Sequence, residues 1–348
     1  VLRLPETEKM ALRGAEIAMI FQEPMTALNP LMRIGDQIAE VFAAHDRFTQ
    51  AERREKALDL IREVQLPDPE KIIRAYPFQL SGGQRQRAMI AMALALEPKL
   101  LIADEPTTAL DVTTQAQILK LILDLREKRG MAVMFITHDF GVVAEIADQV
   151  IVMREGRVVE RGSAEAVLKA PQHDYTKRLL DAIPTGTLPE RRVLSETPAL
   201  EIKGLRKIYR TGGGFFREAR EVRAVDDVSL TVARGEVLGL VGESGSGKST
   251  LGRTAVRLVT PDGGQVLVGG TDLAALSDEE LRKQRHKVQM IFQDPYASLN
   301  PRQRIIGAIT DGPITRGVPR KEAEARAREL LEIVGLGADA ATRFPHEF

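Results

Sequence analysis

Short apolar runs alternate with longer amphipathic segments along the chain. The apolar runs have the length of buried parallel strands and lie at residues 99–104, 132–137 and 237–241. The amphipathic segments repeat apolar side chains at helical spacing and lie at residues 27–45, 50–64 and 112–128. Gly130 can end the last of these helices in a left-handed conformation. Strands that alternate with helices predict an α/β fold around a parallel sheet.

Other segments predict further strands and capped helices. Residues 149–154 and 157–160 predict a hairpin, and further strands are predicted at 200–210, 222–232 and 264–270. Ser81 can cap an Ala/Met-rich helix that runs to Leu96. Residues 251–259 predict another helix, and Ser277 with Glu280 forms a capping box for the next one.

The chain also repeats itself at long range. The hexapeptide MIFQEP at residues 19–24 recurs as MIFQDP at residues 290–295, 271 residues later, and Leu-Asn-Pro follows each copy. A second match aligns Pro77 with Pro345. A period this long indicates two copies of one domain rather than a solenoid.

The two copies are expected to be partial. We expect the C-terminal part of a first copy at residues 1–184, a linker without periodicity at 185–199, and the N-terminal part of a second copy at 200–348. The same offset would place the first copy's equivalent of residue 242 before residue 1. We therefore expect the chain to be an internal piece of a longer protein.

The second copy contains a phosphate-binding loop of the form G-x-x-x-x-G-K-[ST]. It consists of Gly242, Glu243, Ser244, Gly245, Ser246, Gly247, Lys248, Ser249 and Thr250. Its glycines let backbone N–H groups turn toward phosphate oxygens, and the N-terminus of the following helix adds partial positive charge. Lys248 can reach the β- and γ-phosphates, and the Ser249 hydroxyl can bind Mg²⁺. The flanking strand and helix favour nucleotide binding over a merely flexible Gly/Ser-rich connection.

Polar side chains follow the predicted strands of the first copy. Asp104 and Glu105 come at the end of the run at 99–104. In P-loop enzymes an acid in this place holds Mg²⁺, and a neighbouring Glu can polarise or deprotonate the attacking water. His138 follows the run at 132–137 and can contact a γ-phosphate, although a lone histidine there is often structural.

Two further groups can contribute to such a site. Gln22 and Gln293 stand in the repeated Phe-Gln-acid-Pro setting and can bind Mg²⁺ or position a water molecule. The segment Ser81-Gly82-Gly83-Gln84 offers a hydroxyl and backbone N–H groups at a helix start, which makes it a second candidate anion site. The alternative is a helix start that is only loosened by its glycines.

Composition limits the classes of function. Lys plus Arg and Asp plus Glu both total 49, so the net charge of zero gives no electrostatic argument for nucleic acid as the main partner. The absence of cysteine excludes disulfides, thiolate zinc sites and iron–sulfur clusters. The most apolar stretch, residues 88–96, is far shorter than the ~18 residues of a membrane span.

Four motifs together resemble the ATP-binding-cassette ATPases over essentially the whole chain. They are LSGGQRQR at 80–87, LLIADEPTTALD at 100–111, ITHD at 136–139 and GESGSGKST at 242–250. The resemblance implies a P-loop NTPase cassette, α/β in class, with a mixed or parallel sheet core, a helical subdomain and an antiparallel β subdomain, here in two partial copies. It also implies ATP and Mg²⁺ as cofactors.

The resemblance further implies a role for each motif residue. The loop at 242–250 would be Walker A, and Asp104 with Glu105 would be the Walker B pair. Residues 81–84 would form the signature segment. Asp111 would lie in the D-loop, and His138 would be the switch histidine. Gln22 and Gln293 would be Q-loop residues, and Tyr209 would be the aromatic residue that stacks on adenine.

A tail motif narrows the resemblance. PQHDYTKRLL at residues 171–180, followed by Ala-Ile-Pro, is similar to the tail of peptide and nickel importer ATPases, and two cassettes in one chain resemble the fused dipeptide, oligopeptide or glutathione importers. This implies an ATPase at the cytoplasmic face of the bacterial inner membrane. Its partners would be two transmembrane permease subunits and, through them, a periplasmic or lipid-anchored substrate-binding protein.

In that family two cassettes pair head to tail, so that each ATP lies between the Walker A loop of one and the signature of the other. The second copy lacks its own Walker B pair here, so hydrolysis by this piece alone is not implied.

A soluble twin-cassette ATPase acting on ribosomes or DNA would be expected to show a long charged linker or basic patches. A nucleotide-dependent interaction module without hydrolysis is disfavoured by Glu105 and His138. We therefore expect ATP-driven import, without a nucleic-acid partner.

Overall fold

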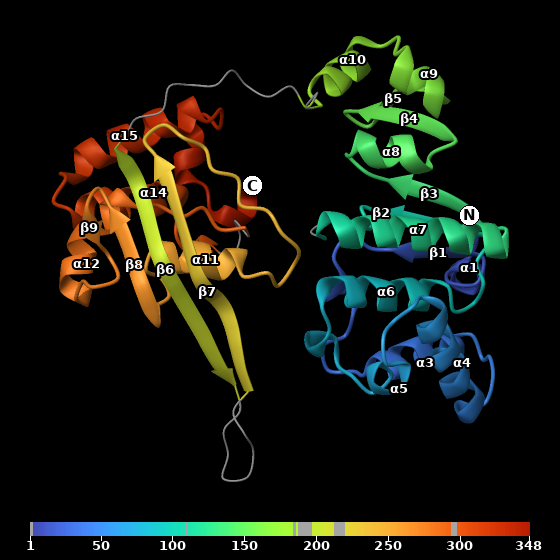
Figure 1. Cartoon of the computed structure of the whole chain (residues 1–348). Helices are drawn as coiled ribbons and strands as arrows, with labels where there is room; N and C mark the ends of the chain where they lie inside the picture. Colours follow the sequence, from blue (N-terminus) through green and yellow to red (C-terminus); the bar gives the residue numbers. More distant parts are fainter. Residues whose placement is uncertain (1–2, 109, 184–185, 187–196, 212–219, 294–297) are drawn as a thin grey trace. The chain divides into compact units, whose positions relative to one another are not determined.

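The computed structural model describes the chain except residues 1–2, 109, 184–185, 187–196, 212–219 and 294–297. The chain divides into two compact units, Val1–Arg192 and Val193–Phe348 (Figure 1). Most of the predicted linker lies outside the described residues.

A three-stranded parallel sheet forms the centre of the first unit. Its strands lie in the order β1 (Ile17–Ile20), β2 (Leu100–Asp104) and β3 (Ala132–Ile136). Hydrogen bonding is parallel throughout, with Ile17 beside Leu100 and Leu100 beside Ala132. The two apolar runs predicted in this region are confirmed as strands, whereas the apolar pattern did not single out β1.

Helices surround this sheet and extend away from it. They are α1 (Glu6–Leu12), α2 (Pro24–Ala27), α3 (Ile34–Ala44), α4 (Gln50–Glu63), α5 (Pro69–Ile72), α6 (Gly82–Ala93), α7 (Val112–Arg129) and α8 (Phe140–Ile146). The predictions for α4, α6 and α7 are confirmed, although α6 ends at Ala93 and not at Leu96 as predicted. Ser81 caps α6, and Gly130 ends α7 in the left-handed conformation.

The helix predicted at 27–45 is wrong in its first part, because α3 begins only at Ile34. The buried Gln37 side chain holds the preceding loop. Its carbonyl oxygen accepts from the Asn29 N–H at 2.9 Å, and its amide donates to the carbonyl oxygens of Asn29 and Met32 at 3.0 Å each. These hydrogen bonds satisfy backbone N–H and carbonyl groups of residues 29–32, which are not helical and lie next to the core.

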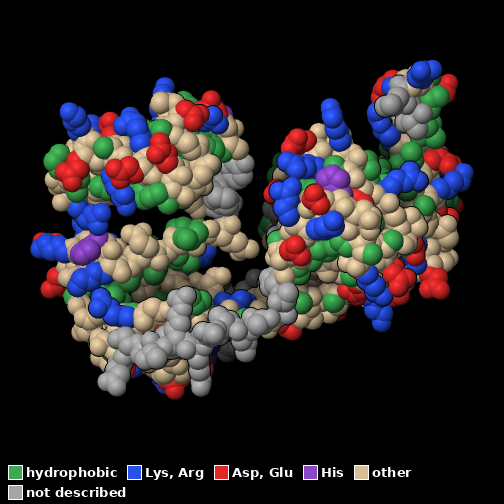
Figure 2. All heavy atoms as spheres, turned by 90° about the horizontal axis from the view of Figure 1, so that it is seen from above, with side chains coloured by type: hydrophobic (Ala, Val, Ile, Leu, Met, Phe, Trp, Pro, Cys, Tyr) green, Lys and Arg blue, Asp and Glu red, His purple; other side chains and the backbone are tan. Residues whose placement is uncertain are grey.

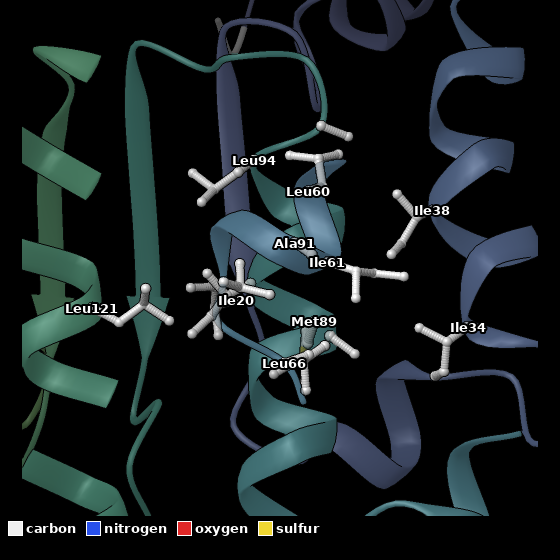
Figure 3. Packing of buried hydrophobic residues seen from close by; sticks show 14 of the residues in the cluster. Ile20, Ile34, Ile38, Leu60, Ile61, Leu66, Met89, Ala91, Leu94 and Leu121 are labelled. Atoms are coloured by element: carbon white, nitrogen blue, oxygen red, sulfur yellow. The ribbon is translucent and has the colours of Figure 1, made fainter. Parts of the chain in front are cut away.

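One apolar core joins the sheet to the helices. Figure 3 shows it running from Leu121 on α7, past Ile20 on β1 and Met89 on α6, to Ile34 and Ile38 on α3. Because α6 lies within this core, the position of its N-terminal end, where the signature segment begins, depends on packing against both the sheet and α3–α4.

An antiparallel hairpin and two short helices complete the first unit. They are β4 (Gln149–Arg154), β5 (Arg157–Ser163), α9 (Ala164–Lys169) and α10 (Asp174–Asp181). The predicted hairpin is confirmed, and its second strand runs three residues further than expected. Val150, Val152 and Val167 form its small core.

The second unit has an antiparallel sheet with the strand order β7-β6-β8-β9. Its strands are β6 (Pro198–Thr211), β7 (Arg220–Ala233), β8 (Gly263–Val268) and β9 (Thr271–Asp272). Its α-helices with described ranges are α11 (Lys248–Ala255), α12 (Asp278–Gln284), α14 (Ile305–Thr315) and α15 (Arg320–Ile333). The three strand predictions and the capping box at Ser277 are confirmed.

Two predictions in this unit need correction. The strand expected at 237–241 does not form, and Val237 and Val241 are 96% and 89% exposed. A parallel strand needs neighbours in its own sheet, and the sheet of this unit is antiparallel. The following helix is α11, which begins at Lys248 and ends at Ala255, earlier than predicted. Arg257, just beyond it, has a left-handed backbone with φ +57°, and the Arg285 guanidinium donates to the carbonyl oxygens of Val256 and Arg257.

Candidate functional site

The carboxyl ends of the three parallel strands bring together three of the predicted site residues. Gln22 follows β1, Glu105 follows β2 and His138 follows β3. The Gln22 amide donates to Glu105 Oε2 at 3.0 Å, and His138 Nδ1 lies 3.1 Å from Glu105 Oε1. Parallel strands end at the same edge of a sheet, so residues more than 80 positions apart meet around one carboxylate.

The backbone of Glu105 is held in an uncommon conformation. Its φ is +43°, in the left-handed region, and its N–H donates to the Ile136 carbonyl oxygen at 2.9 Å. The Thr108 hydroxyl donates to Glu105 Oε2 at 2.9 Å. Non-glycine residues with positive φ are uncommon and often occur at functional sites. Here the conformation turns the carboxylate toward the ends of the neighbouring strands.

The surroundings of Glu105 favour its ionised form. The hydrogen bond with His138, followed by the one from Thr108, lowers the pKa of the Glu105 carboxyl below its ordinary value. A carboxylate that is ionised near neutral pH can accept a hydrogen bond from a water molecule and orient it. Asp104, half-buried, precedes it at the end of β2, opposite Ile136 in the ladder.

The predicted signature segment, residues 81–84, lies at the start of α6. The Ser81 hydroxyl accepts from the Gln84 N–H, and the Gln84 side-chain oxygen accepts from the Ser81 N–H at 3.0 Å. This capping box already satisfies two of the backbone N–H groups that the sequence suggested for an anion. Asp111 is the N-cap of α7, where its side chain accepts a hydrogen bond from the Thr114 N–H.

The loop at 242–250 lies in the second unit and leads into α11. Gly247, with φ +94°, is its N-cap and provides no side-chain cap, so the first N–H groups of α11 have no side-chain partner at the cap. A Cβ on Gly247 would lie 2.1 Å from the Ala224 carbonyl oxygen. Only glycine therefore allows this close approach of the loop to β7.

Lys248 is folded back on its own loop. Its ammonium group donates to the carbonyl oxygens of Gly242 at 2.5 Å and Glu243 at 2.6 Å, and to the Ser246 hydroxyl at 3.2 Å. Its positive charge thus lies at the centre of the loop. A glycine-bounded loop with a central ammonium group and a helix N-terminus fits a phosphate group.

The other predicted site residues lie in the second unit. Tyr209 is on β6, opposite Val222 and partly exposed, with the Lys207 ammonium 5.6 Å from its ring centre. Gln293 is exposed and lies outside helices and strands. The predicted site residues are therefore divided between the two units, and each unit is described with its own set.

Sequence reasoning did not assign roles to Thr108 and Thr114. Both lie in or next to the predicted DEPTTALD motif. Their hydroxyl contacts with Glu105 and Asp111 depend on turn geometry that no periodicity reveals.

The family described as "ABC transporter" matches residues 3–108 and 225–348. The chain belongs to the ABC transporter family. Its fold is accordingly the P-loop NTPase cassette, in agreement with the parallel and antiparallel sheets of the two units.

Curated relatives of this ABC protein share nearly half of its residues. The Glutathione import ATP-binding protein GsiA of Escherichia coli (strain K12) is 47% identical over 363 residues, covering 97% of this chain. GsiA of Shigella dysenteriae serotype 1 is 46% identical over 369 residues, covering 98%. The chain spans only 58–59% of the length of these two relatives.

Among solved structures, one described as the dimeric, post-hydrolysis state of the ATP-binding cassette MJ0796 bound to ADP and Pi is 31% identical. The match covers 47% of this chain and 68% of the MJ0796 chain, with a TM-score of 0.42. The cbiO1 protein of Clostridium perfringens is 28% identical over 49% of this chain and 65% of its own, with a TM-score of 0.40.

Proposed function

We propose that this chain is part of the ATP-hydrolysing subunit of an ABC importer for glutathione or other small peptides. The geometric observation that carries the proposal is the Glu105 carboxylate, held by Gln22, Thr108 and His138 at the end of a parallel sheet. The near-50% identity to glutathione import ATP-binding proteins over almost the whole chain supports the transported class.

ATP would bind through its phosphates at the loop 242–250, where Lys248 neutralises charge and the N-terminus of α11 donates backbone N–H groups. Tyr209 would stack on the adenine. In the second copy, Mg²⁺ would be held by the Ser249 hydroxyl with Gln293 at the Q-loop position. In the first copy, Asp104 and Gln22 would supply the Walker B and Q-loop groups. The ion would supply charge neutralisation on the phosphates.

Glu105 would act on the attacking water. Its carboxylate accepts a hydrogen bond from that water and orients it, and His138 and Gln22 hold the carboxylate in place. His138 would also face the terminal phosphate. Ser81, Gly82, Gly83 and Gln84 would contact the nucleotide of a paired cassette, beside Asp111.

We propose the partners of a membrane importer for the whole protein. These are a second cassette paired head to tail, two transmembrane permease subunits and a substrate-binding protein reached through them, with the ATPase peripheral at the cytoplasmic face of the inner membrane. Among the described helices, none is long and apolar enough to cross a membrane. Figure 2 shows acidic and basic side chains interspersed on the face of each unit that is turned to the viewer, which offers no continuous basic surface there for nucleic acid.

The test is ATP hydrolysis by the purified whole protein, of which this chain is a part, with its permease in lipid vesicles, together with uptake of labelled glutathione. Glu105→Gln keeps the size of the side chain but removes its charge and replaces one acceptor oxygen with an amide donor, and we expect turnover to fall at least about 100-fold while nucleotide still binds. Glu165→Gln, an equivalent change on the exposed surface of α9, serves as the control. Unchanged turnover in Glu105→Gln would refute the assigned role of Glu105, and hydrolysis without glutathione or peptide uptake would refute the importer proposal.

A further inference from the structure

The signature turn and the D-loop touch each other within the first unit. The signature turn comprises residues 81–84, and the D-loop residue Asp111 precedes α7. A Cβ placed on Gly82 would lie 3.7 Å from Leu110 Cδ2, in ordinary contact. A Cβ placed on Gly83 would lie only 2.5 Å from Thr114 Cγ2. The methyl group of Thr114 therefore occupies the space directly over Gly83.

The other branch of the same side chain holds the D-loop. The Thr114 hydroxyl donates to Asp111 Oδ2 at 2.9 Å, and the Thr114 N–H donates to Asp111 Oδ1 at 3.0 Å. Asp111 thus receives two hydrogen bonds from one residue. A threonine has a stiff χ1 angle because both branches leave the same carbon atom, so its methyl and hydroxyl cannot move independently.

We propose that Thr114 is a positioning residue that couples the signature turn to the D-loop. Any shift that brings Gly83 closer to α7 must rotate or push the Thr114 side chain, and rotation takes the hydroxyl away from Asp111. Displacement of Asp111 in turn moves the methyl over Gly83. Two segments about 30 positions apart in the sequence therefore keep one fixed arrangement.

The rest of the α6–α7 pair supports this coupling. Further along the helices, the Arg87 guanidinium donates to Gln117 Oε1 at 3.3 Å. At their C-terminal ends, the Arg129 guanidinium donates to the Leu94 carbonyl oxygen at 2.9 Å. The two helices are thus linked at three levels, so a change at their N-terminal ends is not absorbed by sliding of one helix along the other. Thr114 contacts both functional segments, through its methyl over Gly83 and its hydroxyl on Asp111.

The substitutions that test the proposal separate the two branches. Thr114→Ser keeps the hydroxyl and removes the methyl, whereas Thr114→Val keeps the shape and removes the hydroxyl. Gly83→Ala creates the clash, and the double variant Gly83→Ala/Thr114→Ser removes the methyl that causes it, since the next Thr114 atom lies 3.8 Å away. The same two changes at the exposed neighbour Thr113 serve as matched controls.

Two readouts are needed: kcat and KM for ATP, and amide hydrogen exchange at residues 81–84 and 111–115. We expect Gly83→Ala to lower kcat about 10-fold, as an overpacked contact does, and to speed exchange in both segments. Adding Thr114→Ser should restore kcat to within about threefold and restore protection at 111–115. Thr114→Val should speed exchange at Thr114 and Gln115, and the Thr113 variants should match the wild type.

The activity readout rests on the proposed function, but the exchange readout does not. If the wild-type protein hydrolyses no ATP, the proposed function fails while exchange still decides the coupling. The coupling is refuted if Gly83→Ala leaves exchange at 111–115 unchanged, or if the double variant is no better than Gly83→Ala alone. Should Gly83→Ala fail to fold, recovery of folding in the double variant supports the coupling, and failure of both refutes it.

Discussion

The tripeptide Met-Ile-Phe precedes Gln22 in the first unit and Gln293 in the second, and it is buried differently in the two units. In the first unit Ile20 ends β1 and is fully buried, whereas its counterpart Ile291 lies outside any strand and is 97% exposed. The sequences are nearly identical, so local propensity does not explain the difference. The pairing of β1 with β2 does. The strand exists because a neighbour supplies hydrogen bonds and an apolar cover.

The helices that follow show the same contrast. Helix α4 and helix α15 are both 14 residues long and match at an offset of 270 residues. Val64, just beyond α4, is fully buried in the core that contains α6, whereas Val334, just beyond α15, is 65% exposed. Both helices form, since a helix satisfies its own backbone. Helix formation is therefore independent of the partner, but burial of the apolar face is not.

The largest expected effect separates Ile20 from Ile291. Ile20→Ala should lower the free energy of unfolding of the first unit by about 2–5 kcal/mol, because it leaves a cavity in a packed core. Ile291→Ala should change the stability of the second unit by less than about 0.5 kcal/mol. Urea denaturation, followed by hydrogen exchange in each unit, measures both. Equal costs for the two variants would mean that Ile291 is buried in solution.

A smaller effect is expected for the helix pair. Val64→Ala should cost about 2 kcal/mol, since it removes two buried methyl groups from the contact with α6. Val334→Ala should cost less than about 0.5 kcal/mol, or raise solubility. Thermal unfolding of the two variants against the wild type gives the comparison. A cost at Val334 that matches the cost at Val64 would contradict the open face of α15.

The smallest effect concerns charge. Glu63 at the end of α4 accepts from Lys128 at 2.8 Å and from Arg129 at 2.5 Å, while its counterpart in the second unit is Ile333. Burial, the largest single influence, would raise the pKa of the Glu63 carboxyl, but the hydrogen bonds from Lys128 and Arg129 together lower it.

Because the folded pKa lies below the unfolded one, this carboxylate stabilises the first unit above about pH 4.3, and the contribution is lost as the pH falls through the folded pKa. We expect about 1 kcal/mol. Urea denaturation between pH 3 and pH 6 should show that Glu63→Gln reduces the pH dependence of the first unit and leaves that of the second unchanged. An unaltered slope in the first unit would show that Glu63 is not ionised in this pair.

Sequence patterns correctly predicted the helices and strands that pack against other predicted helices and strands. The strands β2 and β3 and the helices α6 and α7 follow from apolar runs and capping residues because each packs against another of the set. The segment 237–241 has an equally apolar sequence, yet it does not form a strand. A hydrophobic pattern shows that a segment can be buried, but it does not show whether a neighbouring strand is present to pair with it.

The candidate site was predictable in its residue types but not in its geometry. Sequence patterns placed Glu105 and His138 after strands but predicted no strand before Gln22, and the three adjacent parallel strands bring these residues together. The left-handed backbone of Glu105 could not be predicted, and neither could the two contacts of Thr114, with Asp111 and with Gly83. All of them arise from contacts across turns.

The segment Val237-Leu238-Gly239-Leu240-Val241 also affects how the protein behaves in concentrated solution. It is apolar, exposed and outside any helix or strand, and such segments can pair edge to edge with their own copies. A formal net charge of zero adds little repulsion between molecules. Colloidal stability should therefore be lowest near neutral pH, and a single charged side chain in place of Gly239 should raise the concentration at which the protein stays dispersed.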